Sequence, residues 1–182
     1  MKKEAIEVLK NRRSIRKYKA EQVSKEELDM VLEIGTYAPT SRGLQSPVIV
    51  AVQDKTIIAQ LSQMNAKVIS EIRSVPVEEV SDPYFGAPTI VLVFAPKSTN
   101  TQVEDGSAVM TQLALGAYAV GLGSCWINRE RQMFETEEGR ALMEKWGLNE
   151  DYVGIGGLSL GYADGPHPVP KERKAGYIVM VQ

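Results

Sequence analysis

The chain has 182 residues, a length that suits one domain with a substantial core and is short for two. Apolar residues make up 43% of it and charged residues 24%, the composition of an ordinary globular protein. A formal net charge of −2 argues against a surface for nucleic acid or for an anionic membrane. Cys125 is the only cysteine, which excludes an intrachain disulfide, and the chain has neither a membrane-spanning apolar run nor a signal-peptide pattern. We therefore expect a cytoplasmic protein.

Two helices are predicted before the first strand. The first covers residues 3–10, and its apolar face is formed by Ala5, Ile6 and Leu9. The second begins after Ser24, because Ser24 and Glu27 have the spacing of a capping box, and it ends before Pro39. Its apolar residues are three and four positions apart and so form one stripe: Leu28, Val31, Leu32 and Gly35.

Strand patterns alternate with further helices over the rest of the chain. Four or five segments have the β-branched or alternating character of strands, namely residues 48–53, 89–95, 123–127, 154–162 and 177–181. The last segment is too apolar for a free tail, and we expect it to pair with another subunit, because unpaired apolar edges invite pairing. This order predicts a single α+β domain over residues 1–182.

The helices between these strands differ in clarity. Asp54 is predicted to cap a helix that runs to about Gln63, and residues 64–82 combine a further helical pattern with a loose connector. The clearest helix covers residues 101–120, and we expect it to be central because its apolar residues occupy more than one face. Asp105 falls in its first turn, where a carboxylate favours the helix dipole. Thr136 is predicted to begin the last helix.

Two basic clusters stand out in this acidic chain. The segment from Asn11 to Tyr18 gathers Arg12, Arg13, Arg16 and Lys17 around Ser14. Arginine forks suit bidentate binding of phosphate, although a charge run alone is more often a solvated face. A second cluster, residues 171–174, lies near the other end of the chain. Both clusters together favour a shared anionic ligand.

Residues 38–47 are predicted to form a polar loop, because they are dense in proline, serine, threonine and glycine. Such loops carry binding groups more often than strands do, and an idle surface connector remains the alternative.

Several kinds of active site are disfavoured by the sequence. His167 is the only histidine, and Cys125 lies in an apolar strand, so a Cys–His nucleophile is not expected. One cysteine and one histidine cannot build the usual zinc site, and no metal ligand set is predicted. Neither a phosphate-binding loop of the G-x-x-x-x-G-K-[ST] form nor a G-x-G-x-x-G motif after a strand is present. Anion-binding groups without acid–base machinery indicate an enzyme whose cofactor performs the chemistry.

Four motifs in this order resemble those of the FMN-dependent nitroreductase family. They are Arg12–Arg16, the loop from Ala38 to Gln45, Gly121–Ile127, and Pro170–Arg173. The resemblance covers nearly the whole chain. It implies a central, mostly antiparallel sheet of four to five strands flanked by helices, and an intertwined homodimer in which the C-terminal strand is exchanged.

The resemblance also assigns cofactor-binding residues. It implies that Arg12, Ser14, Lys171 and Arg173 hold the FMN phosphate and ribityl chain, with Arg13 beside them. It places Arg16 near the N1–O2 edge of the flavin, where positive charge stabilises the reduced cofactor. A second group reaches the flavin of the partner subunit: Pro39, Thr40, Ser41, Gly43 and Gln45. Ile127 and Asn128 are expected against the ring, a backbone N–H there donating to N5, and Asn65 at the ring edge.

The implied activity is ping-pong oxidoreduction, in which NADH or NADPH reduces FMN and a nitroaromatic, a quinone or a similar flat acceptor then takes hydride from N5. Three departures from the family pattern lie around the expected substrate face: Gly43, Ser46–Pro47 and Asn128–Arg129. Two alternatives therefore stay open. One is a reductive dehalogenase-like or flavin-consuming relative, and the other is a flavin-binding protein without turnover.

Overall fold

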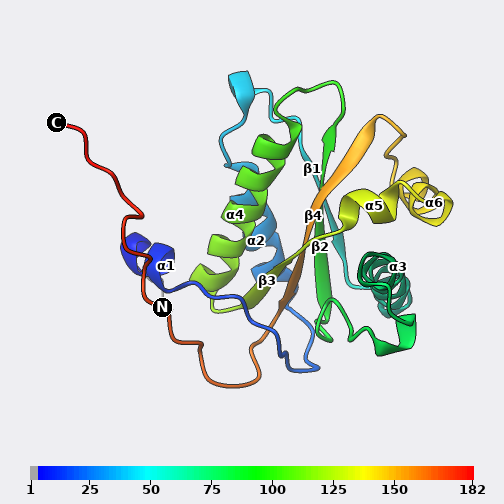
Figure 1. The fold of residues 1–182 in the computed structure, drawn as a ribbon, viewed down its shortest axis with the longest axis horizontal. Helices are drawn as coiled ribbons and strands as arrows, with labels where there is room; N and C mark the ends of the chain where they lie inside the picture. Colours follow the sequence, from blue (N-terminus) through cyan, green and yellow to red (C-terminus); the bar gives the residue numbers. More distant parts are fainter. Residues whose placement is uncertain (1–3) are drawn as a thin grey trace.

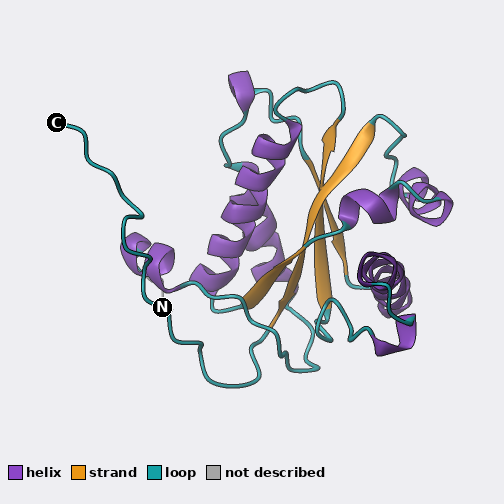
Figure 2. Cartoon of the chain, viewed as in Figure 1, coloured by secondary structure: helices purple, strands orange, loops and turns teal. Residues whose placement is uncertain are grey.

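A four-stranded antiparallel sheet with helices on both faces forms the body of the protein (Figures 1 and 2). The computed structural model describes residues 4–182. The strand order is β1-β2-β4-β3, and the strands are β1 (Val48–Val52), β2 (Thr89–Pro96), β3 (Gly123–Ile127) and β4 (Tyr152–Gly161). The predicted α+β class and antiparallel sheet are thereby confirmed.

Six α-helices and two short 3₁₀ turns are found in residues 4–182. The α-helices are α1 (Ala5–Asn11), α2 (Lys25–Thr36), α3 (Lys55–Arg73), α4 (Gln102–Val120), α5 (Glu130–Phe134) and α6 (Glu137–Lys145). The 3₁₀ turns are η1 (Ser41–Gly43) and η2 (Val77–Glu79). None of the helices in this part of the chain combines the length and apolar character that a membrane span needs.

Strand β2 holds the two halves of the core together. Its side chains alternate between the faces of the sheet, so Ile90, Leu92 and Phe94 join one cluster and Val91 and Val93 the other. All five are fully buried, and each contributes about 1.5–3 kcal/mol through loss of contact with water. Helices α3, α5 and α6 cover the first cluster, and α2 and α4 cover the second (Figure 1).

Helices α2 and α4 follow the sequence pattern closely. The capping box between Ser24 and Glu27 is present, and Leu28, Val31 and Gly35 are buried on α2. Helix α4 is central as predicted, because it packs against α2 and against the sheet. Helix α1 differs: Val8 is its buried residue, whereas Ile6 and Leu9 are exposed. The predicted apolar face was wrong because α1 lies beside α4, outside the sheet layers, and Lys3, where that prediction began, lies outside the described residues.

Helix α3 extends well past the predicted end at Gln63. Its inward residues Leu61, Met64 and Val68 keep a helical spacing through that position, and the helix ends only where Ser74 adopts a left-handed conformation. The helical pattern within residues 64–82 is thus part of α3, and the loose connector is the segment after Ser74 that contains η2. The earlier end was wrong because neither proline nor glycine interrupts the apolar stripe before Pro76.

The predicted C-terminal strand is absent from the described chain. Residues 177–182 have no sheet partner, and the side chains from Tyr177 to Val181 are 76–93% exposed. Figure 1 shows this tail passing α1 and leaving the body of the molecule. A strand is defined by a neighbouring strand, and within one chain none lies beside this segment, so its pairing with another subunit stays a prediction.

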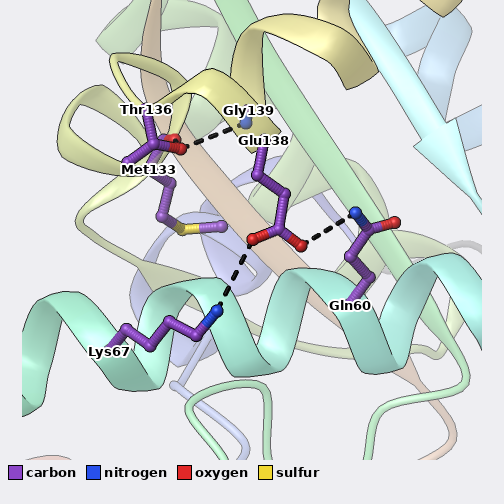
Figure 3. Close-up of polar contacts among 6 residues, drawn as sticks. All are labelled: Gln60, Lys67, Met133, Thr136, Glu138 and Gly139. Atoms are coloured by element: carbon purple, nitrogen blue, oxygen red, sulfur yellow. Dashed lines mark hydrogen bonds and ion pairs between the residues drawn. The ribbon is translucent and has the colours of Figure 1, made fainter.

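Glu138 links the two helices that cover one face of the sheet (Figure 3). Its carboxylate accepts a hydrogen bond from Gln60 Nε2 at 2.9 Å and lies 3.6 Å from Lys67 Nζ, so that α6 is joined to α3. One residue on, the Gly139 N–H donates to Thr136 Oγ1 at 3.1 Å, which caps α6 as predicted. A Cβ at Gly139 would lie 2.6 Å from Phe134 Cα and even closer to the Met133 carbonyl oxygen. The first turn of α6 therefore packs so closely on the end of α5 that only glycine fits at position 139.

We predict that Gly139→Ala destabilises the protein. Helix propensity alone favours alanine by about 1 kcal/mol, but the added methyl meets backbone that cannot move aside, and overpacking of this kind costs about 1–3 kcal/mol. The melting temperature should therefore fall by several degrees. Glu144→Ala on the exposed side of α6 is the control and should change it little. A rise in melting temperature for Gly139→Ala would contradict the packing argument.

Candidate functional site

The basic segment lies along the open edge of β3. Ser14 forms a parallel bridge with Ser124, the Ile15 N–H donates to the Ser124 carbonyl at 2.9 Å, and Tyr18 bridges Ala163. The Tyr18 hydroxyl also donates to the Ile15 carbonyl at 2.6 Å and lies 2.9 Å from Ser159 Oγ. Burial raises the pKa of Tyr18 well above its usual range, so it stays a neutral hydrogen-bonding anchor. These contacts fix the backbone of the basic segment at the sheet edge.

The cations of this segment fall into two kinds. Lys17 pairs with Asp164 at 2.7 Å, and Arg13 donates to the carbonyl oxygens of Lys10 at 2.9 Å and Arg12 at 2.6 Å. Arg13 thus completes the C-terminal end of α1, and its cofactor role stays a prediction. Arg12 and Arg16 have no carboxylate partner among residues 4–182. Two guanidinium groups are therefore left to bind an anion beside Ser14.

Arg16 connects this edge with the residues at the far end of β3. Its guanidinium carbon lies 6.0 Å from the centre of the Phe85 ring, in the turn that follows Asp82. The neighbouring Tyr84 is buried, and its hydroxyl donates to Glu130 Oε1 at 3.2 Å. Glu130 in turn begins α5, directly after the end of β3. The basic segment and the end of β3 therefore border the same part of the molecule.

Asn65 of α3 holds the chain just beyond β3. It is completely buried, and its Nδ2 donates to the Asn128 carbonyl at 3.0 Å, while its Oδ1 has no partner among the described residues. The structure thus places Arg12, Ser14 and Arg16 in the segment along the open edge of β3. Ile127, Asn128 and Asn65 lie at the end of the same strand. That donor-rich set suits a phosphate joined to a flat heteroaromatic group, which is the chemistry of FMN.

The predicted polar loop lies elsewhere. Thr40 Oγ1 accepts the Gln45 N–H at 2.9 Å, and the Ser41 N–H donates to the Asp105 carboxylate, also at 2.9 Å. Asp105 also accepts the Thr101 hydroxyl at 3.1 Å, so its carboxylate joins the loop to α4 in addition to lying near the helix N-terminus. Thr40 and Gln45 line a groove of about 420 Å³ between α2, the loop and β1.

In one chain the polar loop and the basic segment are far apart. Figure 1 shows η1 of the loop at one end of α4 and the basic segment at the other. The tail passes one end of the basic segment, since His167 contacts the Asn11 carbonyl at 2.7 Å. Further along, Lys171 and Arg173 are exposed, and Arg173 Nε donates to the Lys171 carbonyl at 3.1 Å. The five loop residues are therefore not assembled with the basic segment within one chain: Pro39, Thr40, Ser41, Gly43 and Gln45.

Cys125 and His167, which were not expected to form a nucleophilic pair, lie in different surroundings. Cys125 is buried in β3, and its Sγ lies 3.6 Å from the Trp126 carbonyl. His167 contacts the Asn11 carbonyl at 2.7 Å, and its ring stacks on Tyr118. The two side chains thus have different partners.

Two features near Asn128 had not been predicted. Glu130 is only 1% exposed, and burial raises the pKa of its carboxyl to about 8. Because Glu130 stands between Arg129 and Arg131, the sequence suggests an exposed segment there and gives no sign of this burial. Arg129 has φ 95°, a left-handed conformation that favours glycine. The sequence had marked Asn128–Arg129 as a departure from the family pattern, but it gave no sign of this backbone conformation.

Known proteins match the chain along most of its length. Residues 9–162 match the profile of the nitroreductase family. A protein of Archaeoglobus fulgidus, named as a proposed NADH dehydrogenase/NAD(P)H nitroreductase, is 27% identical over 96% of this chain and 90% of its own. A nitroreductase with bound FMN from Bacteroides fragilis superposes with a TM-score of 0.89 at 27% identity, covering 99% of this chain and 100% of that one. An FMN-dependent nitroreductase from Clostridium difficile gives 0.74 at 32% identity, covering 92% of each chain.

We predict that Arg129→Gly stabilises the folded protein by about 1 kcal/mol, because glycine adopts a positive φ without the steric cost that arginine bears there. Chemical denaturation would measure the change. Arg129→Ala is the matched control, since it removes the same side chain but keeps the Cβ. Equal stability of the two variants would contradict the argument from backbone conformation.

Proposed function

Because the chain belongs to the nitroreductase family, we propose that it is an FMN-dependent NAD(P)H oxidoreductase acting on nitroaromatics, quinones or similar flat acceptors. FMN in the Bacteroides fragilis and Clostridium difficile relatives supports the cofactor, and the name of the Archaeoglobus protein supports the reductant. The observation that carries the proposal is a pair of arginines without a carboxylate partner among residues 4–182, Arg12 and Arg16, on either side of Ser14, whose backbone is bridged to β3.

The residues around this edge have distinct tasks in the proposal. Arg12 and Ser14 bind the phosphate, since a guanidinium fork and a hydroxyl together satisfy several of its oxygens. Arg16 places positive charge where the reduced cofactor gains negative charge. When bound, FMN supplies the acceptance and release of hydride. The reductant and the acceptor occupy the same face in turn, which is the ping-pong order.

We further propose that the active form is a cytoplasmic homodimer of one FMN-binding domain per chain, residues 1–182. The polar loop of one chain then reaches the site of the other, and the C-terminal segment pairs with the partner. Two observations support this: the loop is remote from the basic segment of its own chain, and the apolar tail is exposed. Burial of five large apolar side chains of the tail would favour association.

The visible absorbance spectrum of the purified protein tests the proposal. We expect flavin bands, present on isolation or after addition of FMN, that bleach when NADH or NADPH is added without oxygen. Reoxidation by nitroaromatics would then identify the acceptor class, whereas reoxidation by halogenated phenols alone would favour the dehalogenase alternative. Bound flavin that neither reductant bleaches would indicate a flavin-binding protein without turnover. A protein that takes up no FMN would overturn the proposal.

Three alanine variants separate the tasks of the cations. Arg12→Ala should weaken FMN binding by about tenfold or more, because a hydrogen bond to a charged group is worth about 1.5–3 kcal/mol. Arg16→Ala should slow flavin reduction more than it weakens FMN binding. Lys17→Ala is the control, because this neighbouring cation is already paired with Asp164. If all three variants lost FMN affinity equally, the basic cluster would attract anions only through its total charge, and the separate tasks of Arg12 and Arg16 would be contradicted.

A further inference from the structure

A buried acid lies directly behind the chain segment that follows β3. Glu130 packs against the β4 backbone so closely that a Cβ at Gly157 would collide with its Oε1. Its Oε1 accepts the Tyr84 hydroxyl at 3.2 Å, and its Oε2 is buried without a partner among residues 4–182. No cation in this part of the chain forms an ion pair with it. An ionised carboxylate in such a place is costly, so the neutral form is favoured.

The groups that face Glu130 agree with a neutral acid. Burial raises the pKa of Glu130 to about 8, and the backbone amides of Glu130 and Gly157, the Tyr84 hydroxyl and the Arg129 charge only partly oppose that rise. Tyr84 cannot serve as a base, because burial and the neighbouring Glu130 raise its own pKa well above its usual range. Asn65 from α3 is uncharged. At pH 7 Glu130 therefore holds a proton.

This acid connects with the Asn128–Arg129 peptide through Tyr84 and Asn65. The Asn65 amide lies close enough to the Tyr84 hydroxyl to lower its pKa, and the same amide donates to the Asn128 carbonyl at 3.0 Å. The peptide is trans, so its N–H points opposite to its C=O. Because the carbonyl is held toward buried Asn65, the Arg129 N–H is turned the other way. No described residue accepts a hydrogen bond from it.

We propose that Glu130, Tyr84 and Asn65 are positioning residues that together aim the Arg129 N–H at an acceptor nitrogen of a flat heteroaromatic ligand bound beside the end of β3. The inference rests on the proposed function, in which that ligand is the flavin. The strained φ of Arg129 agrees with a peptide that is held in one orientation by its neighbours. Ionisation of Glu130 would place an unpaired charge in this network and loosen the peptide.

The affinity of the apoprotein for FMN between pH 7 and 9 tests this inference. Over that range the FMN phosphate is already doubly charged, so its own titration contributes little. We expect the affinity of the unchanged protein to fall about tenfold as Glu130 ionises, following linkage between proton and ligand. Glu130→Gln keeps the shape and a neutral hydrogen-bonding group, and its affinity should stay level. Parallel profiles for both proteins would overturn the inference and leave the proposed function intact.

Two measurements without ligand address the network directly. The NMR order parameter of the Arg129 amide should fall in Asn65→Ala, and an unchanged order parameter would overturn the inference even if FMN does not bind. Stability should also respond to pH. An acid whose pKa rises from 4.5 unfolded to about 8 folded stabilises the protein most below pH 4.5 and loses that contribution as pH rises to 8. Glu130→Gln should lack this slope, and the same slope in both proteins would contradict a buried proton on Glu130.

Discussion

The backbone pairing of Ser14 and Ile15 with Ser124 is the contact on which the candidate site depends. Strand β3 is an edge strand, and edge strands leave a row of unpaired N–H and C=O groups. The N-terminal segment satisfies part of that row, and in doing so it carries its arginines to the sheet. Because backbone groups and buried Tyr18 make the attachment, the guanidinium groups of Arg12 and Arg16 are not needed for it. A structural requirement of the sheet thus creates an anion-binding edge.

Local signals in the sequence predicted most of the fold. The Ser24–Glu27 capping box and the β-branched run of β2 depend on neighbours within a few residues, so their patterns were sufficient. Features that depend on distant partners were not predictable in the same way. The segment after Tyr177 looked like a strand, but a strand needs a neighbour that the sequence cannot supply. The buried face of α1 was likewise decided by its place beside α4.

The candidate site likewise has features that local sequence predicts and features that depend on distant contacts. Arginines beside a serine could be recognised as an anion-binding segment from residue type alone. The burial of Glu130 could not, because Arg129 and Arg131 on either side make it look like a solvated position. Its environment is created by the backbone of β4 and by Tyr84, which is 46 residues earlier in the chain. Contacts of that separation are set by the assembled sheet.

Two neighbouring residues break local rules at this point, since Arg129 has a conformation suited to glycine and Glu130 is an acid in the core. Each lowers stability, and sequences tend to retain such conflicts where they serve a site. The two conflicts share one consequence, because both bear on the orientation of the Asn128–Arg129 peptide. A glycine at position 129 would relieve the strain and also widen the conformations open to that peptide. We therefore interpret the strained Arg129 backbone and the buried Glu130 together: both lower stability, and both help to hold the Arg129 N–H in one orientation.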